Sequence, residues 1–399
     1  MSPKAFQQAR NDDTSEKDQD RYRRFTVDER PYFPFLRADA NNFDSIKEVT
    51  AYILGLSETS KINLVVSVVN GGNTNRLFCV SSIQDNGSSR SLRSSTASTA
   101  PLPESVLVRI FGAEGLIDRD VETSTYAALA QQGLALAYYG RFANGRIEEW
   151  SDWKPLTEKD MMKSDISGYI AMQLARLHCQ FTIPKHLVEY HNPQGTPTMW
   201  TQLEDWLASA RKATFRNDKD SQRAEALQLG NLVDELEWLR KDVISSNAKV
   251  GFCHNDLLAS NILYSVPLQL IDFEYGGINY LSYDIANHFN EFAGGTAPED
   301  KATPNYDMLP NKDFQRNFCL AYLEEIMSAS KQTASDKEME HSIEKLMQEV
   351  EGFILANHLV WGLWGVVQSV IATDEDDFDY MHYGSCRINK YFELKQEQR

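Results

Sequence analysis

Short apolar runs separated by turns fill the first part of the chain. Two β-branched runs, 61–69 and 76–83, flank a turn rich in Gly and Asn, and this pattern predicts a β-hairpin. Further strand-like runs follow at 106–110, 134–139 and 146–150. This part of the chain is therefore expected to form a small domain built mainly from strands.

Helical spacing dominates after residue 150. There, apolar residues recur three and four positions apart, as on the buried face of an amphipathic helix. The change predicts a boundary between residues 31–150, a small β-rich domain, and residues 151–399, a larger helical one, so the chain is expected to be α+β. Over the whole chain, two helices are predicted in the first domain, at 44–56 and 120–131. Six are predicted in the second, at 165–179, 200–210, 224–241, 279–292, 314–328 and 341–365.

Two polar segments are expected to lie outside the folded body. Residues 1–30 are charged and contain few aliphatic side chains, which is the composition of a disordered tail. Residues 85–103 are rich in Ser, Gly, Thr and Pro and interrupt the strand-like runs, so they are expected to form a mobile surface insertion. Neither segment indicates a function.

Charge and cysteine usage narrow the classes of function. The 399 residues include 57 acidic and 40 basic side chains, a net charge of −17. Nucleic acids and anionic membrane surfaces require basic patches, so both are disfavoured as partners, whereas a cationic substrate is compatible with this charge. The five cysteines include no C-x-x-C pair, which indicates a reduced, cytoplasmic protein without a disulfide framework or zinc site.

One apolar segment is long enough to span a bilayer. Residues 352–372 lack Asp, Glu, Lys and Arg. The segment contains Asn357, His358 and Gln368, and its two tryptophans lie in its middle, whereas membrane-spanning helices place tryptophans at their ends. It is therefore expected to be a buried core helix with no membrane insertion. The N-terminus lacks the apolar stretch of a secretory signal.

The segment 254–288 carries the strongest chemical pattern. It begins H-N-D-L-L-A-S-N, which places Asp256 five positions before Asn261, and an apolar run then reaches Asp272 in I-D-F-E. This is the layout of a phosphoryl-transfer site: Asp256 would accept the proton of a hydroxyl nucleophile, while Asn261 and Asp272 would bind Mg²⁺ at nucleotide phosphates. A loop whose carboxylates merely cap helices would explain D-x-x-x-x-N alone. It would not explain this motif followed, at the spacing seen here, by an apolar run that ends in D-F-E.

Phosphate-binding residues are predicted in the first domain. The hairpin turn would offer backbone N–H groups to phosphate oxygens. Arg109, in the strand V-L-V-R-I, would bind two further oxygens, and Glu122 in the next helix would hold Arg109 in place. The structural alternatives are an ordinary hairpin and an arginine paired with a surface carboxylate. The predicted turn residues are Gly71, Gly72, Asn73, Thr74 and Asn75.

The sequence also resembles a known family. The motifs H-N-D-L-L-x-x-N-I-L, I-D-F-E-Y and D-I-A-N-H-F-N-E-F are similar to those of the choline/ethanolamine kinases, and to the ethanolamine branch more than the choline branch. The resemblance extends from about residue 67 to residue 392 and implies a protein-kinase-like two-lobed fold. It also implies ATP- and Mg²⁺-dependent phosphorylation of ethanolamine to phosphoethanolamine, the first step of the CDP-ethanolamine route to phosphatidylethanolamine.

The resemblance extends to ligand-binding residues. Glu149 and Ser151 would belong to a hinge whose backbone meets adenine. Glu291 would contact the substrate ammonium group, with a solvated helix carboxylate as the structural alternative. The tryptophans of W-G-L-W have the spacing of core residues, but by resemblance they would form a box around the ammonium group. The expected substrate contacts are Asp256, Glu274, Glu291, Trp361, Trp364 and Tyr383.

Two polar residues are expected to support the site rather than to react. Asp284 is expected to brace the catalytic loop through hydrogen bonds. His178, an isolated histidine in a helix, is expected to satisfy a local bond and to have a structural role.

The resemblance favours ethanolamine over choline. The family's choline branch tends to carry Trp where this chain has Phe292, with aromatic residues soon after, whereas A-G-G-T follows here. One wall of the box is therefore expected to be missing. A primary ammonium offers three N–H donors to carboxylates, whereas a quaternary ammonium relies on aromatic faces. Choline remains the alternative or second substrate.

Three other classes of protein fit the pattern less well. A protein kinase is disfavoured because D-F-E replaces D-F-G and no A-P-E segment follows. An antibiotic or sugar phosphotransferase should lack N-H-F-N-E-F and W-G-L-W. A catalytically inactive binding protein typically loses one of Asp256, Asn261 and Asp272, and all three are present. The oligomeric state stays open, a homodimer included.

Overall fold

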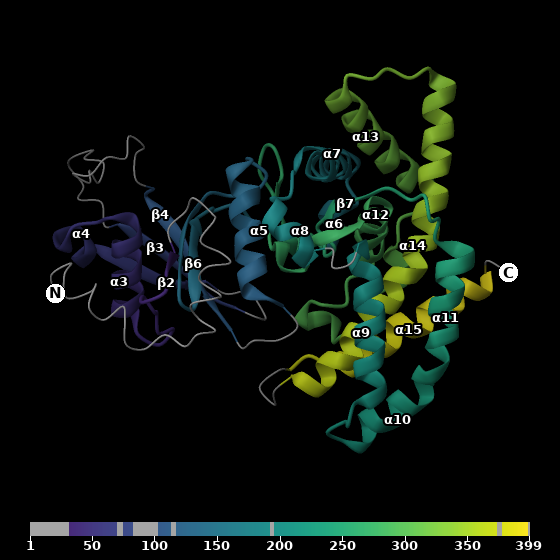
Figure 1. Ribbon diagram of the computed structural model, residues 1–399, viewed down its shortest axis with the longest axis horizontal. Coiled ribbons are helices and arrows are strands. Elements are labelled where there is room, and N and C mark those ends of the chain that lie inside the picture. Colours follow the sequence, from purple (N-terminus) through teal and green to yellow (C-terminus); the bar gives the residue numbers. More distant parts are fainter. Residues whose placement is uncertain are drawn as a thin grey trace. The chain divides into compact units, whose positions relative to one another are not determined.

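The computed structural model describes residues 32–69, 75–82, 103–112, 117–191, 195–372 and 377–397. The chain divides into two compact units, Met1–Asp152 and Trp153–Arg399, and Figure 1 labels many of their helices and strands. The division falls two residues after the boundary expected from the sequence. The tail at 1–30 and residues 85–102 of the predicted insertion lie outside the described residues.

A six-stranded sheet forms the body of the first unit, in the order β1-β5-β6-β4-β3-β2. Neighbouring strands are antiparallel except β1 and β5, which run parallel. The predicted β2–β3 hairpin is confirmed, with Val69 opposite Leu77. The strands are β1 (Tyr32–Phe33), β2 (Leu64–Val69), β3 (Asn75–Ser82), β4 (Ser105–Phe111), β5 (Tyr138–Phe142) and β6 (Gly145–Glu149), and the helices are α3 (Phe43–Leu54), α4 (Glu58–Ile62) and α5 (Arg119–Gln131).

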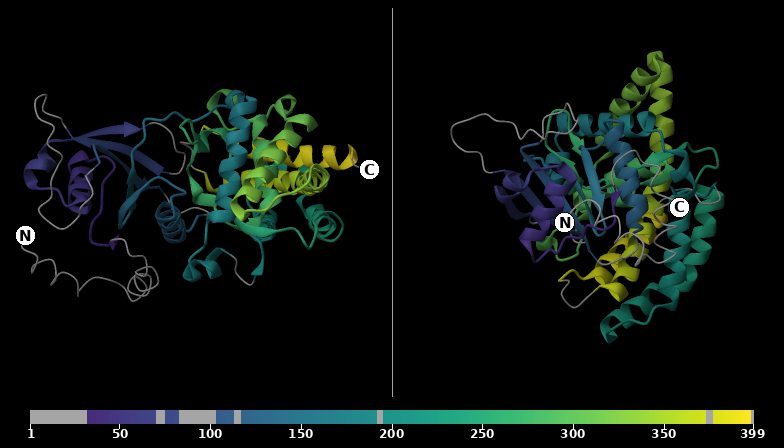
Figure 2. Two further views of the ribbon diagram at one scale, coloured as in Figure 1. Left: turned by 90° about the horizontal axis from the view of Figure 1, so that it is seen from above. Right: turned by 60° about the vertical axis from the view of Figure 1, so that its left-hand side comes forward.

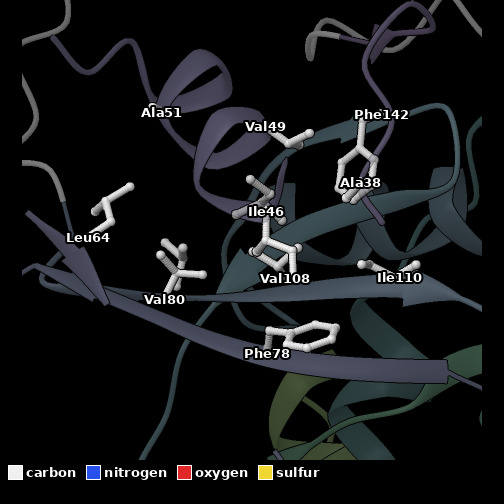
Figure 3. Close-up of a cluster of buried hydrophobic side chains, with 12 residues drawn as sticks. Ala38, Ile46, Val49, Ala51, Leu64, Phe78, Val80, Val108, Ile110 and Phe142 are labelled. Atoms are coloured by element: carbon white, nitrogen blue, oxygen red, sulfur yellow. The ribbon is translucent and has the colours of Figure 1, made fainter. Parts of the chain in front are cut away.

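Helix α3 packs on this sheet and closes a hydrophobic core. Ile46 and Val49 are three positions apart, so they share one face of the helix. Both are buried in a cluster with Phe78, Val108 and Phe142 of the sheet (Figure 3). Each such side chain stabilises the fold by roughly 1.5–3 kcal/mol when it is fully buried. The helix predicted from apolar spacing at 44–56 is thereby confirmed.

Two strand predictions in this unit are wrong at their N-terminal ends. Residues 61 and 62 belong to α4 rather than to a strand, because Ser57 caps that helix by accepting a hydrogen bond from the N–H of Ser60. The run at 134–139 becomes strand only from Tyr138, where β5 begins. The N–H of Leu134 instead donates to the carbonyl of Leu129 at the end of α5, 2.9 Å.

Helices make up most of the second unit. Two short antiparallel sheets pair β7 with β10 and β8 with β9. The strands are β7 (Val250–Cys253), β8 (Ile262–Leu263), β9 (Gln269–Leu270) and β10 (Gly277–Tyr280). The helices are α6 (Glu158–Met161), α7 (Ser164–Gln180), α8 (Lys185–His191), α9 (Thr198–Lys212), α10 (Asp218–Leu227), α11 (Leu232–Trp238), α12 (Leu281–Asn290), α13 (Lys312–Ser330), α14 (Asp336–Ile371) and α15 (Tyr380–Glu397).

Helix α14 packs against α9, α12, α13 and α15 of this unit. Helix α15 lies along it in both sets of views (Figure 1, Figure 2). Leu355, Leu359 and Leu363 have no exposed surface, so the predicted buried core helix is confirmed. Among the described residues, α14 is the one helix long and apolar enough to cross a membrane, and 67% of its 18-residue apolar stretch is buried inside the structure. The core helix of a folded protein can have the same length and apolar composition.

The helix predicted over residues 224–241 is broken in two. Gln228 ends α10 in the left-handed conformation, with φ 48°. A 3-10 turn at Leu229–Asn231 follows before α11 begins. The apolar spacing continues across the break, so the pattern predicts one helix where the chain makes two.

Candidate active site

The loop that follows β7 holds Asp256 and Asn261. The strand ends at Cys253, and the backbone turns at Asn255, whose φ of 65° lies in the left-handed region. Asparagine adopts this region more readily than most residues. A 3-10 turn at Ala259–Asn261 closes the loop and leads into β8. Asp256 therefore lies in a short loop that is fixed at both ends.

Helix α12 braces this loop through two buried side chains. The carboxylate of Asp284 accepts hydrogen bonds from the backbone N–H groups of His254 and Asn255, both at 2.7 Å. One helical turn later, Asn287 Oδ1 accepts a hydrogen bond from the N–H of Leu257, 3.1 Å. The bracing role predicted for Asp284 is confirmed.

His178 of α7 completes the brace. Its Nδ1 lies 2.8 Å from the Tyr322 hydroxyl and its Nε2 lies 3.0 Å from Asp284 Oδ2. Burial alone would raise the pKa of Asp284, but the hydrogen bonds from His178 and His254 hold it below its ordinary value. His178, Cys253 and Asp284 place metal-ligand atoms within 4.8 Å of one another, yet hydrogen bonds already engage the imidazole and the carboxylate. The structural role predicted for His178 is confirmed.

Hydrogen bonds within the loop orient the Asn261 amide. Its nitrogen donates to the backbone carbonyl of Asp256, 2.9 Å, and to the Asp256 carboxylate, 3.3 Å. The amide oxygen is therefore the atom of Asn261 that can bind a cation. Mg²⁺ prefers oxygen ligands and retains several waters, so this orientation fits the predicted role of Asn261.

The second predicted metal ligand, Asp272, lies in a tight backbone turn. Its φ of 61° and ψ of 64° place it in the left-handed region, just before a 3-10 turn at Phe273–Tyr275. The N–H of Ile271 donates to the carbonyl of Asn261, 2.9 Å. The carbonyl of Ile271 lies 2.8 Å from His254 Nε2. These two contacts tie the Asp272 turn to the loop that carries Asn261, and backbone strain of this kind is typical of functional sites.

Four carboxylates share this region of the second unit. Burial raises the pKa of Asp256 well above its ordinary value, and the negative charges of Glu291, Asp272 and Glu274 raise it further, against a hydrogen bond from Asn261 that lowers it. Carboxylates influence one another in this way only when they lie close together. Cations stabilise such a group, and both Mg²⁺ and an ammonium group are cations. The donor set therefore fits both.

The carboxylate of Glu291 is buried and paired with Arg387, a residue that was not predicted to belong to the site. Arg387 Nη1 donates to Glu291 Oε1 and to the Tyr383 hydroxyl, both at 3.1 Å, and Nη2 donates to Asn357 Oδ1, 2.7 Å. Burial raises the pKa of Glu291, and the charge of Arg387 opposes that rise. A solvated helix carboxylate, the structural alternative for Glu291, is therefore wrong. Arg387 lies four positions, about one helical turn, after Tyr383. This spacing places both side chains on one face of the helix, and it is the sequence signal that could have identified Arg387 as a site residue.

The two predicted tryptophans meet other aromatic rings. The ring centroid of Trp361 lies 5.1 Å from that of Tyr275 and 5.5 Å from that of Trp364, which lies 6.1 Å from that of Tyr383. Trp364 Nε1 donates to the Tyr275 hydroxyl, 2.9 Å. Tyr275 was not predicted as a site residue, although it directly follows I-D-F-E. The aromatic cluster consists of Tyr275, Trp361, Trp364, Phe378 and Tyr383, with Ala302 packed against it.

The aromatic cluster adjoins the carboxylates. Burial raises the pKa of Tyr275 well above its ordinary value, and the charges of Glu274 and Asp256 raise it further. Tyr383 accepts a hydrogen bond from the same guanidinium that holds Glu291. The residues predicted to contact the substrate are thus brought together in one unit. Aromatic faces beside negative charges attract an alkylammonium group.

In the first unit, Arg109 belongs to a buried cluster of ion pairs. Arg109 Nε donates to Glu148, 2.8 Å, and Arg146 bridges Glu148 and Glu122 at 2.6 and 2.7 Å. Glu122, the residue predicted to hold Arg109, interacts with its charge: burial raises the pKa of Glu122, and the positive charges of Arg146 and Arg109 lower it. The carboxylate bonded to Arg109 Nε is that of Glu148. The reason is strand register: Arg109 lies opposite Arg146, and alternate residues of a strand share a face, so Glu148 joins them. Because Arg109 and Glu148 are buried, the surface-pair alternative is wrong.

The structure places the other predicted nucleotide contacts only in part. Asn75 begins β3 and is buried, and Ser151 follows β6. The N–H of Glu149 donates to the carbonyl of Ala137, 2.8 Å, and its carboxylate accepts from the N–H of Ala137, 3.0 Å. The Glu149 N–H is therefore engaged within this unit rather than offered to adenine. The remaining contacts, Gly71, Gly72, Asn73 and Thr74, lie outside the described residues.

Comparison with known proteins identifies the family. The choline/ethanolamine kinase family model matches residues 66–392. A probable choline kinase 2 of Arabidopsis thaliana is 32% identical over 295 residues, and ethanolamine kinase 1 of Mus musculus is 34% identical over 302 residues; each match covers 73% of this chain and 77% of the relative. A solved Plasmodium vivax ethanolamine kinase is 25% identical, with 96% of both chains covered and a TM-score of 0.69. The predicted kinase-like α+β fold is confirmed, and the chain belongs to the choline/ethanolamine kinase family.

Proposed function

We propose that this chain transfers the γ-phosphoryl group of ATP to the hydroxyl of ethanolamine, giving phosphoethanolamine and ADP. The observation that carries the proposal is a single group of residues in the second unit. Asp256 lies close to Asn261 and Asp272, the proposed oxygen ligands of Mg²⁺, and to Glu291 and the aromatic cluster. A proton acceptor, metal ligands and an ammonium site are the parts that such a reaction needs.

Asp256 is the group that receives the hydroxyl proton in this proposal. The hydroxyl oxygen bonds to the γ-phosphorus while the bond from that phosphorus to the bridging oxygen breaks, and ADP leaves with the electron pair. The proton passes to the carboxylate of Asp256 and then to solvent. Asp284 holds the loop through the backbone, so the acceptor is fixed before the substrate arrives. Positioning of this kind supplies much of the rate enhancement in phosphoryl transfer.

Asn261 and Asp272 would hold Mg²⁺. When bound, the ion neutralises phosphate charge and stabilises the charge that develops on the leaving oxygen. The amide nitrogen of Asn261 is engaged by Asp256, so its oxygen is the donor. The left-handed turn at Asp272 is tied to Asn261 through Ile271, which keeps the two ligands in one arrangement.

The carboxylates beside the aromatic cluster favour ethanolamine over choline. A primary ammonium donates three hydrogen bonds, and charge-assisted bonds to carboxylates such as Glu274 and Glu291 are the strong ones. The trimethylammonium group of choline has no N–H donor and relies on the aromatic faces. Because Arg387 offsets part of the charge of Glu291, we expect a moderate preference, with choline as a second substrate.

We place this reaction in the cytoplasm, as the first step of the CDP-ethanolamine route to phosphatidylethanolamine. All five cysteines are free thiols, and Cys253 and Cys319 are buried. Free thiols fit a reducing compartment.

The kcat/KM for ethanolamine is expected to exceed that for choline by about tenfold, which corresponds to roughly one additional hydrogen bond to a charged group. A coupled assay of ADP release, with both alcohols under one set of conditions, measures the two values. A choline value equal to or above the ethanolamine value would contradict the preference and leave the kinase assignment standing. ADP release that neither alcohol stimulates would overturn the proposed function itself.

Arg109→Ala is expected to raise the KM for ATP by about tenfold or more, because we propose that its guanidinium binds phosphate oxygens. The KM for ethanolamine should stay near the wild-type value. Arg146 still pairs with Glu122 and Glu148 in this variant, so neither carboxylate is left without a cation.

Arg141→Ala is the matched control for Arg109→Ala. It removes another buried arginine of the same sheet, one that pairs with Asp120, and should leave the ATP KM near that of the wild type. The phosphate role of Arg109 is contradicted if both variants raise the ATP KM equally, or if Arg109→Ala raises the ethanolamine KM instead.

A further inference from the structure

The segment 293–305 folds back on itself after helix α12. The N–H of Asn305 donates to the carbonyl of Ala293, 2.7 Å, which closes the segment at its base. Within it, the N–H of Gly295 donates to the Asp300 carboxylate, 2.8 Å. Gly295 has φ 99°, and a Cβ there would lie 2.8 Å from the backbone nitrogen of Pro304. The segment is therefore closely packed against itself and has a defined shape.

This shape brings Ala302 onto the aromatic cluster. Ala302 is 1% exposed and packs with Trp361 and Tyr383. The next residue, Thr303, is tied to α15 by a contact of 3.1 Å between its Oγ1 and His382 Nε2. His382 directly precedes Tyr383, so this contact holds the Ala302 methyl group beside the Tyr383 ring.

The backbone at Ala302 is one that alanine rarely adopts. Its φ is 59°, and that of the preceding Lys301 is 50°. Side chains with a Cβ are disfavoured in this left-handed region because the Cβ approaches the carbonyl oxygen. The surrounding contacts must therefore impose the conformation, and such strain is found where a position matters for function.

We propose that the methyl group of Ala302 limits the size of the ammonium group that the site accepts, which makes Ala302 a specificity-determining residue. This inference rests on the proposed function. The sequence predicts a missing wall because A-G-G-T follows Phe292. In the structure, the segment 293–305 supplies no aromatic ring to the cluster but packs the methyl group of Ala302 against Trp361 and Tyr383. Choline carries three methyl groups where ethanolamine carries hydrogens, so a fixed methyl group in the wall excludes choline more than ethanolamine.

Ala302→Gly is expected to raise the ratio of the choline kcat/KM to the ethanolamine kcat/KM by about three- to tenfold, the effect of one methyl group in an apolar contact. The change should appear mainly as a lower KM for choline. Glycine adopts positive φ without steric cost, so this variant keeps the backbone of the segment.

Lys301→Gly is the matched control. It removes a side chain from the neighbouring residue, which also has positive φ, and so relieves the same kind of backbone strain. The Lys301 side chain, however, is exposed. Its substrate ratio should equal that of the wild type.

Both alcohols are assayed with wild type, Ala302→Gly and Lys301→Gly under one set of conditions. An unchanged ratio in Ala302→Gly, or an equal rise in Lys301→Gly, overturns the inference about Ala302. In that case, wild-type turnover of either alcohol still supports the proposed function. A wild type that phosphorylates neither alcohol overturns the proposed function and this inference with it.

Discussion

Asp256→Asn is expected to lower kcat for ethanolamine by at least about 10²-fold, the usual contribution of a positioned proton acceptor. The amide has the size of the carboxylate but does not take the hydroxyl proton. The bonds that shape the loop survive, because Asn261 donates to the backbone carbonyl of Asp256 and Asp284 accepts from backbone N–H groups. Lost turnover would therefore report the missing acceptor rather than a displaced loop.

Titration calorimetry with MgATP provides the second readout for Asp256→Asn. Nucleotide affinity should be retained, since Asn261 and Asp272 are unchanged. Asp307→Asn makes the same chemical change at an exposed position of the same unit, and it should keep wild-type kinetics. Near-normal turnover in Asp256→Asn would rule out its role as the proton acceptor.

Asp272→Asn is expected to lower kcat by about 10²–10³-fold, as expected when a group that stabilises transition-state charge is removed. It should also weaken MgATP binding, because an amide replaces the anionic metal ligand. Asparagine is the right replacement here, because Asp272 has φ 61° and asparagine tolerates that region. Alanine would add roughly 1–2 kcal/mol of backbone strain and would confuse the effect of charge with an effect on folding.

The magnesium dependence of nucleotide binding separates a metal ligand from a merely structural carboxylate. In the wild type, nucleotide affinity should rise with Mg²⁺ concentration, and Asp272→Asn should need more Mg²⁺ to reach the same affinity. The melting temperature of the variant should stay close to that of the wild type. An unchanged Mg²⁺ dependence would show that Asp272 does not bind the metal.

The catalytic loop could be predicted from the sequence because its parts are close together along the chain. Asp256, Asn261 and Asp272 lie within one short segment, so their spacing alone restricts how they can be arranged. Asp284 begins the D-I-A-N-H motif in the helix that follows. Its bonds to the loop backbone depend on this local order.

The partners of the charged residues could not be predicted because they depend on register and helix packing. Arg109 and Glu148 are 39 positions apart, and they meet only because β4 pairs with β6 in one register. Glu291 and Arg387 are 96 positions apart, on elements brought together by the packing of the second unit. No spacing rule in a single sequence links residues so far apart.

Backbone conformations that a residue type disfavours could not be predicted from the sequence either. Gln228 and Ala302 both adopt positive φ, which neither residue type favours. At Gln228 this breaks a predicted helix, and at Ala302 it returns the chain to the aromatic cluster. In each case the surrounding structure overrides the local preference, and that information is absent from the local pattern.

The most direct test of the central claim is a reaction of purified enzyme with ATP, Mg²⁺ and ethanolamine whose hydroxyl oxygen carries an isotopic label. Mass spectrometry of the product then follows both the phosphoryl group and the labelled oxygen. If the hydroxyl attacks phosphorus, phosphoethanolamine forms with the label retained, and its formation falls sharply with Asp256→Asn. Absence of phosphoethanolamine, or a product that has lost the labelled oxygen, would contradict the account.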